Sequence, residues 1–131
     1  MSDHDWSAEV TNPETVRDVL GSPPPPLTDY HLDSVLIDER AASVTLRFSA
    51  FAVPDGAADL WQARGRNAVE LVLVCIGVKN FEVNGWSGWP ATTATLAGNT
   101  VVLAGQDKRV SFEATEIRAE CPVGRLWNRS Q

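Results

Sequence analysis

The chain has 131 residues and a formal net charge of −6, from 17 acidic and 11 basic residues. This length fits one domain over residues 1–131, which needs neither a metal nor a disulfide to hold its core. The acidic balance argues against nucleic acid as a direct ligand, because phosphate contacts need clustered Lys and Arg. It is compatible with plain solubility or with a basic protein partner.

The N-terminal part predicts one short helix, following residues 1–8, which we expect to form a mobile terminus. Asn12 is placed to accept hydrogen bonds from the first turn, and Pro13 is tolerated there because its missing N–H costs nothing. Gly21 is suited to end the helix. Because so short a helix is not stable alone, its apolar face must pack on the rest of the domain. That face consists of Val16, Val19 and Leu20.

The run Pro23–Pro26 imposes an extended backbone without internal hydrogen bonds. Such runs also bind aromatic grooves, but here the run follows a helix end and precedes a strand. We interpret residues 22–26 as a stiff connector.

From Leu32 onward the apolar period is two, which is typical of β-strands. Residues 38–42 are suited to a hairpin loop, and residues 43–50 predict a half-buried strand. The segment from Asn67 to Lys79 is apolar on both faces, so we expect a central strand covered on both sides. The short helix and the loops that carry tryptophan are the candidates for covering its second face.

Several further short strands follow, separated by turns that contain glycine. They are expected over residues 92–97, 100–104, 109–115 and 116–121. The predicted fold class is mainly β (α+β): an antiparallel β-sandwich or strongly curved sheet of about eight strands, with one short N-terminal helix packed on it.

No arrangement of residues predicts catalysis, a bound metal or a cofactor. His31 lies between two aspartates, where it is either an oriented base or half of a metal site; a surface histidine among solvated acids is the favoured interpretation. Cys75 lies in the most apolar strand, where burial raises the pKa of a thiol and makes it a poor nucleophile. Together with the distant Cys121 it is expected to be a free thiol, and a reducing, cytoplasmic location follows. The N-terminus lacks the features of a signal peptide, and the longest apolar run is too short to span a bilayer.

Two groups of residues are candidates for binding a partner. The first is an acidic cluster near the first strand, which is either an ordinary solvated face or a docking patch for a cationic partner. Its members are Asp29, Asp33, Asp38 and Glu39. The second is the turn with Trp86 and Trp89, which either covers the core or forms an exposed aromatic platform for a sugar or a protein. We expect Trp86 to be mainly buried and Trp89 to be the residue in contact with a partner.

An ordered series of apolar and Gly-Trp positions runs through most of the chain, from roughly Trp6 to Ile117. It comprises Trp6, Val10–Pro13, Val16, Leu20–Gly21, Pro26–Leu27, Leu32, Val35–Ile37, Val44–Phe48, Trp61, Asn67–Leu71, Val83–Trp86, Phe112–Ala114 and Ile117. This series resembles the immunity protein 50 family of bacterial polymorphic-toxin systems.

The resemblance implies a cytoplasmic, non-enzymatic protein that binds a cognate toxin domain and occludes its active site stoichiometrically. An acidic inhibitor suits a basic toxin, because complementary fields raise association rates. The chain is expected to act as a monomer or small homo-oligomer. A small carbohydrate- or ligand-binding β-domain that uses exposed tryptophans is the alternative function.

Overall fold

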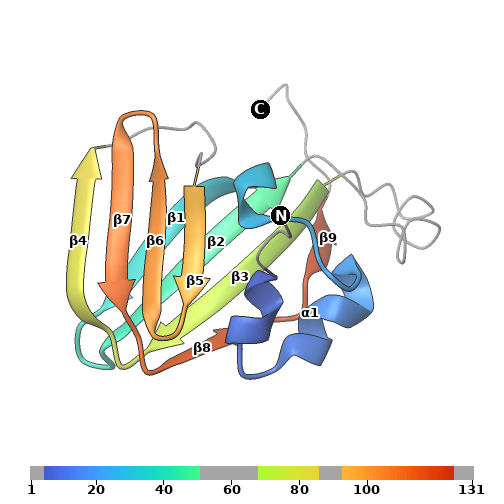
Figure 1. The fold of residues 1–131 in the computed structure, drawn as a ribbon, viewed down its shortest axis with the longest axis horizontal. Helices are drawn as coiled ribbons and strands as arrows, with labels where there is room; N and C mark the ends of the chain where they lie inside the picture. The colour runs from blue at the N-terminus through green and yellow to red at the C-terminus, as the bar shows by residue number, and fades with distance from the viewer. Residues whose placement is uncertain (1–4, 51–67, 86–92, 126–131) are drawn as a thin grey trace.

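The computed structural model describes residues 5–50, 68–85 and 93–125. These residues form two antiparallel β-sheets, accompanied by one α-helix and two short 3-10 helices (Figure 1). The predicted fold class is therefore confirmed, with nine strands in place of about eight. The strand that the prediction missed is β9, because Pro122 separates it from β8.

The helices and strands are as follows. The helices are η1 (Trp6–Glu9), α1 (Pro13–Leu20) and η2 (Leu27–Asp29). The strands are β1 (His31–Asp38), β2 (Ser43–Ala50), β3 (Ala68–Ile76), β4 (Lys79–Gly85), β5 (Thr93–Ala97), β6 (Thr100–Gly105), β7 (Lys108–Glu113), β8 (Glu116–Ala119) and β9 (Val123–Arg125).

The first sheet has the order β1-β2-β3-β8, and β9 pairs with β3 as well. The second sheet has the order β4-β7-β6-β5. The expected hairpins are present: β1 pairs with β2, β5 with β6, and β6 with β7. In each hairpin the strands are connected at one of the turns that the sequence predicted, over residues 38–42, 98–99 and 105–107.

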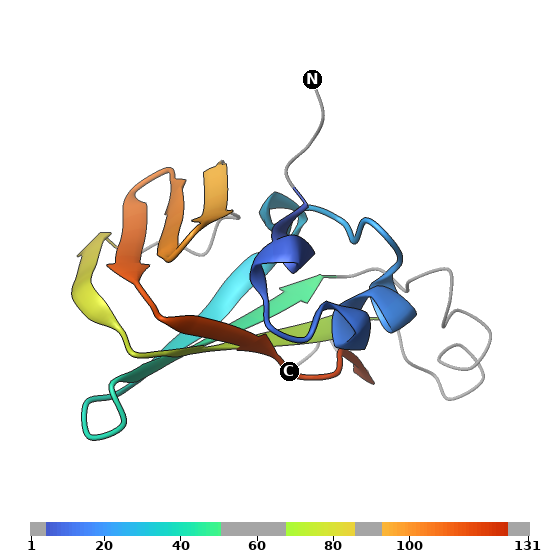
Figure 2. The same ribbon diagram turned by 60° about the horizontal axis from the view of Figure 1, so that its bottom comes forward.

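The second sheet and the N-terminal helices lie on the same face of the first sheet (Figure 2). This inner face is formed by the alternate positions of β2 and β3 that the sequence predicted, and its central side chains are fully or almost fully buried. They are Val44, Leu46, Phe48, Leu71, Leu73 and Cys75. Each buried side chain of this size contributes about 1.5–3 kcal/mol of transfer free energy.

The outer face of β3 differs from its prediction. Val72 is 7% exposed, whereas Val74 and Ile76 are only half-buried. Of the two candidates for covering this face, α1 packs on the other side, since Val16 of α1 belongs to the same core cluster as the inner face. The other proposed cover, Trp86, lies outside the described residues.

The beginning of the described chain is part of the core. Trp6 is 3% exposed, and its indole N–H donates a 2.8 Å hydrogen bond to the carbonyl of Pro25. Arg17 of α1 forms an ion pair with Asp5 at 3.1 Å, and hydrogen bonds from Ser7 lower the pKa of the Asp5 carboxyl. The large apolar indole therefore packs this segment on the core, and the mobility expected of residues 1–8 stays a prediction.

Candidate functional site: an apolar groove between two open sheet edges

Two of the four sheet edges are covered by residues of the N-terminal segment. The β5 edge is contacted by η1 and η2, and the Glu9 carboxylate accepts a 2.9 Å hydrogen bond from the Gly98 amide at the end of this strand. A covered edge cannot pair with the strand of another chain.

The β8 edge is covered by Thr11 and Asn12. The Thr11 amide donates to the Ile117 carbonyl at 2.8 Å. The Asn12 side chain then acts like a peptide group toward Ala119: its Oδ1 accepts from the amide at 2.9 Å, and its Nδ2 donates to the carbonyl at 2.7 Å. Asn12 does precede α1, but its side chain makes no capping bond. The prediction that Asn12 caps the helix is wrong, because both the Oδ1 and the Nδ2 of its side chain are bonded to the backbone of β8.

The other two edges, β1 and β4, face a common opening. Each stands at the end of its sheet order, so neither pairs with a further strand among the described residues. Residues from both strands line the same hollow, which places the two edges opposite each other across one side of the sandwich. The closed and open edges are thus on different sides of the molecule (Figure 1).

Two adjoining hollows form a groove between these edges, which we call the β1–β4 groove. One has a volume of about 290 Å³ and is lined mainly by β1, β4 and β7. The other, of about 640 Å³, lies at the β1–β2 loop and the start of β4. Ile37 and Phe81 line both hollows, so the two are continuous.

The floor of the groove is apolar. Phe81 is stacked on the buried Phe112, with ring centroids 5.8 Å apart, which fixes the start of β4 on the core. Ile37 is 51% exposed and Val83 is 49% exposed, although both side chains direct toward the groove. Large apolar groups exposed together in a concave surface are typical of a site that binds another molecule.

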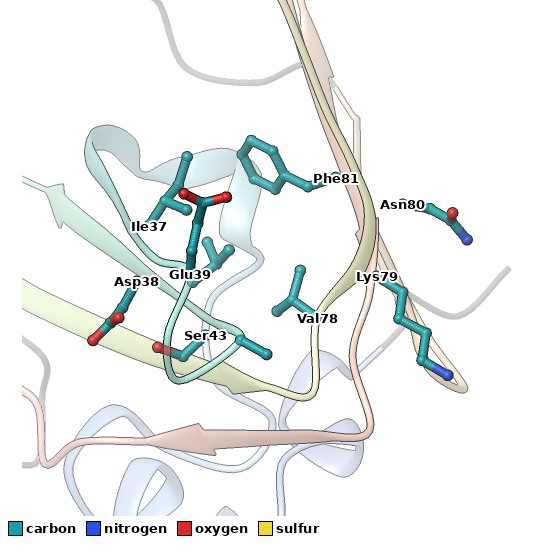
Figure 3. A pocket seen from close by; sticks show the side chains of 10 residues that line it. Ile37, Asp38, Glu39, Ser43, Val78, Lys79, Asn80 and Phe81 are labelled. Carbon is teal, nitrogen blue, oxygen red and sulfur yellow. The ribbon is translucent and has the colours of Figure 1, made fainter.

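Charged groups stand at the ends of the groove. Glu39 extends beside Ile37 and Phe81, whereas Lys79 and Asn80 extend away from the hollow (Figure 3). At the other end, Lys108 lines the hollow, and partial burial lowers the pKa of its ammonium group. The groove therefore has Glu39 at one end, and both Asp33 and Lys108 at the other.

The structure brings together three of the four acidic candidates. Asp33, Asp38 and Glu39 all line the groove, whereas Asp29 lies in η2 and is not among the lining residues. Asp38 also has a structural role, because its carboxylate accepts hydrogen bonds from the amides of Arg40 and Ala41 in the hairpin loop. The fifth candidate, Trp89, lies outside the described residues.

Sequence reasoning missed the apolar part of the site. The alternation predicts only a strand position for Ile37, and Val83 only precedes the turn that carries Trp86. A signal was present in β1, where Leu36 and Ile37 are adjacent and so place large apolar groups on both faces of one strand. Such a pair indicates either a central strand or an edge strand with a binding face.

The groups considered for catalysis do not assemble in the described part of the chain. His31 is half-buried at the start of β1, and Cys75 is fully buried, which raises the pKa of its thiol to about 12. Across residues 5–50, 68–85 and 93–125, no group of three His, Cys, Asp or Glu side chains is arranged to hold a metal ion. No described helix combines the length and the apolar character needed to cross a bilayer.

Comparison with known proteins identifies one family. The family model described as Immunity protein 50 matches residues 12–126, which is most of the chain, and confirms the resemblance seen in the sequence. Neither the comparison with curated proteins nor that with solved structures found a match.

Proposed function

We propose that this chain, which belongs to the immunity protein 50 family, binds a cognate toxin domain in the cytoplasm and neutralises it by stoichiometric occlusion. The toxin is held at the β1–β4 groove. The chain performs no catalysis itself; it acts by covering the surface that the toxin needs for its own activity.

The observation that carries this proposal is the pair of half-exposed apolar side chains in the groove, Ile37 and Val83. Neither side chain belongs to the buried core cluster. Both lie between β1 and β4, the two strand edges that no other described strand pairs with. Protein interfaces concentrate their binding energy in such apolar centres, surrounded by polar residues that exclude water. Here the surrounding residues include Asp33, Glu39 and Lys108.

Charge supports the same partner. The chain has a formal net charge of −6. All charged side chains on the β1 side of the groove are acidic, namely Asp33, Asp38 and Glu39. A basic toxin surface would be attracted over distances of about 10 Å at 0.1 M salt, which raises the association rate. A nuclease is one toxin class with such a surface.

The alternative of a carbohydrate-binding domain gains no support from the described residues. Trp6 is buried and its N–H is bonded to Pro25, so it offers no platform for a sugar. Trp86 and Trp89 lie outside the described residues. The groove floor is aliphatic apart from Phe81, which is half-buried against Phe112.

The test compares two neighbouring residues that point to opposite faces. Ile37 pairs with the buried Val44 and points into the groove, whereas Leu36 pairs with Thr45 and points to the outer face. Leu36 is 64% exposed, so Ile37→Glu and Leu36→Glu both replace an exposed apolar group of similar size. Each variant is co-expressed with the protein encoded beside this chain's gene, and survival and co-purification are measured.

The wild-type chain and Leu36→Glu should protect the cell and co-purify with the toxin, and Ile37→Glu should do neither. Equal protection by both variants would show that the toxin does not use the groove. Failure of the wild-type chain to protect or to co-purify would contradict the immunity function itself.

A further inference from the structure

We infer that the toxin contributes a β-strand that pairs with the open edge of β1, so that recognition rests on backbone hydrogen bonds as well as on the groove. This inference deepens the proposed function and rests on it. The occupant to which it commits is an extended toxin segment with alternating apolar side chains and a Lys or Arg at the end that lies beside Glu39.

The direction of the β1 backbone groups follows from the hydrogen bonds of the sheet. The Glu120 amide donates to the Val72 carbonyl at 2.9 Å, so Val72 directs its backbone groups toward β8. Directions alternate along an antiparallel strand, so the next residue, Leu73, bonds to β2 through its partner Leu46. The following position on β2, Thr45, therefore bonds to β1.

The partner of Thr45 on β1 is Leu36, whose N–H and C=O are consequently occupied by β2. Val35 and Ile37, on either side, direct their N–H and C=O groups away from the sheet. The side chains of the same two residues line the groove. No strand in the described part of the chain pairs with these groups, so an incoming strand would find backbone donors and acceptors and an apolar surface at the same positions, as strand addition requires.

Strand β1 has only part of the usual protection of an edge: it carries Asp33, Asp38 and a register shift, but no strand among the described residues pairs with its outer side. It contains no proline and no lysine, and its irregularity is confined to residues 32–34. From Ser34 to Asp38 the pairing with β2 is regular, which leaves a straight template of about 17 Å. The opposite edge, β4, is a poorer template because its register shifts between Lys79 and Glu82.

Charge favours a basic residue in the incoming strand. Glu39 stands at one end of the groove, where Lys79 extends away from the hollow (Figure 3). Asp33 and Lys108 both line the other end. A cationic residue of the toxin is therefore favoured at the Glu39 end.

The main test separates the Ile37 backbone from its side chain. Ile37→Pro removes the outward N–H while retaining apolar bulk, and proline is tolerated where an edge strand directs its N–H to solvent. Ile37→Ser keeps the N–H but loses the apolar side chain. Leu36→Ser is the control, since it changes the opposite face. Affinity for the co-purified toxin is measured for each variant after circular dichroism confirms the fold.

Strand addition predicts that Ile37→Pro and Ile37→Ser each weaken binding at least tenfold, and that Leu36→Ser binds like the wild-type chain. Hydrogen exchange of the wild-type complex supplies a readout that needs no variant: the amides of Val35 and Ile37 should become protected on binding. Glu39→Lys should lower the affinity more at low than at high salt; an unchanged affinity would contradict the cationic residue at that end.

The outcomes are distinguishable. If the wild-type chain does not bind the toxin, the proposed function fails. If it binds, but the Val35 and Ile37 amides exchange as in the free chain, strand addition fails and the proposed function stands. A homodimer of the free chain that Ile37→Pro dissociates would identify a second copy as the occupant and overturn the assignment to the toxin.

Discussion

The clearest test of how the N-terminal segment covers the β8 edge concerns Asn12. Its side chain forms hydrogen bonds with the backbone of Ala119 on β8. The two bonds measure 2.9 and 2.7 Å, and Ala119 is buried. Asn12→Ala leaves both backbone groups of Ala119 without their partners, and each orphaned buried group costs about 1–3 kcal/mol. Because Asn12 is only half-buried, water replaces part of the loss, and we expect a total of about 2 kcal/mol.

Two further variants separate edge covering from helix capping. As helix caps, Asp and Ser are about as good as Asn, so a capping role predicts that Asn12→Asp and Asn12→Ser are nearly neutral. As a cover for β8, Asp loses the donor to the Ala119 carbonyl and places a negative charge beside it. Ser cannot supply both groups. The expected order of stability is therefore Asn above Asp, with Ser close to Ala.

The measurement is chemical denaturation, supported by thermal melting. For a chain of 131 residues, a loss of 2 kcal/mol corresponds to a fall in Tm of roughly 7 °C. Thr15→Ala is the control, since it removes only a 3.3 Å contact with the Asn12 side chain and leaves the bonds to β8. If Asn12→Asp and Asn12→Ser are as stable as the wild-type chain, the reasoning about the β8 edge is wrong.

Two other predictions concern the core and the groove end. Burial, aided by the charge of Asp29, raises the pKa of Tyr30 from 10.0 to about 12. The phenol thus stays neutral in the fold while it ionises in the unfolded chain, so its contribution is full below pH 10 and is lost as the pH rises toward 12. The free energy of unfolding of the wild-type chain should fall by about 2 kcal/mol relative to Tyr30→Phe over this range, measured by urea denaturation; a constant difference would contradict the assignment. Gly85 has φ +82°, and an added Cβ would collide with the carbonyl oxygen of Asp107, whereas at Gly98 (φ +59°) it would meet open space. Gly85→Ala should therefore cost at least about 3 kcal/mol and Gly98→Ala about 1 kcal/mol, and equal losses would refute the close approach.

The local elements were predictable from the sequence because each depends on short-range rules. The alternation of Val44, Leu46 and Phe48 identified β2 and its buried face, and glycine marked the hairpin turns. Gly85 was noticed as part of a Gly-Trp turn, but its requirement comes from the Asp107 carbonyl across the sheet. That contact joins two segments distant in the chain, so the turn sequence alone did not reveal it.

The candidate site was only half predictable for the same reason. The acidic residues Asp33 and Glu39 are visible as a local cluster, but the groove exists because β1 and β4 meet across two sheets. The alternation of apolar residues within β1 or within β4 does not show that these two strands face each other. The role of Asn12 was likewise misread, because a capping residue and a peptide-like cover for a distant strand have the same local sequence.

The distribution of covered edges connects the fold with the proposed function. An uncovered edge with apolar neighbours is a risk for aggregation, and proteins usually protect it. This chain covers β5 and β8 with residues of its N-terminal segment, including Glu9 and Asn12. Within residues 5–50, 68–85 and 93–125, nothing pairs with the outer sides of β1 and β4, and Ile37 and Val83 are half-exposed between them. Since these two side chains bury only about half of their surface, they add less to folding stability than core residues do, and substitutions there should affect toxin binding more than the unfolding transition. If substitutions at Ile37 and Val83 reduce binding but leave stability nearly unchanged, these exposed side chains serve an interface and are not a sign of incomplete packing between the two sheets.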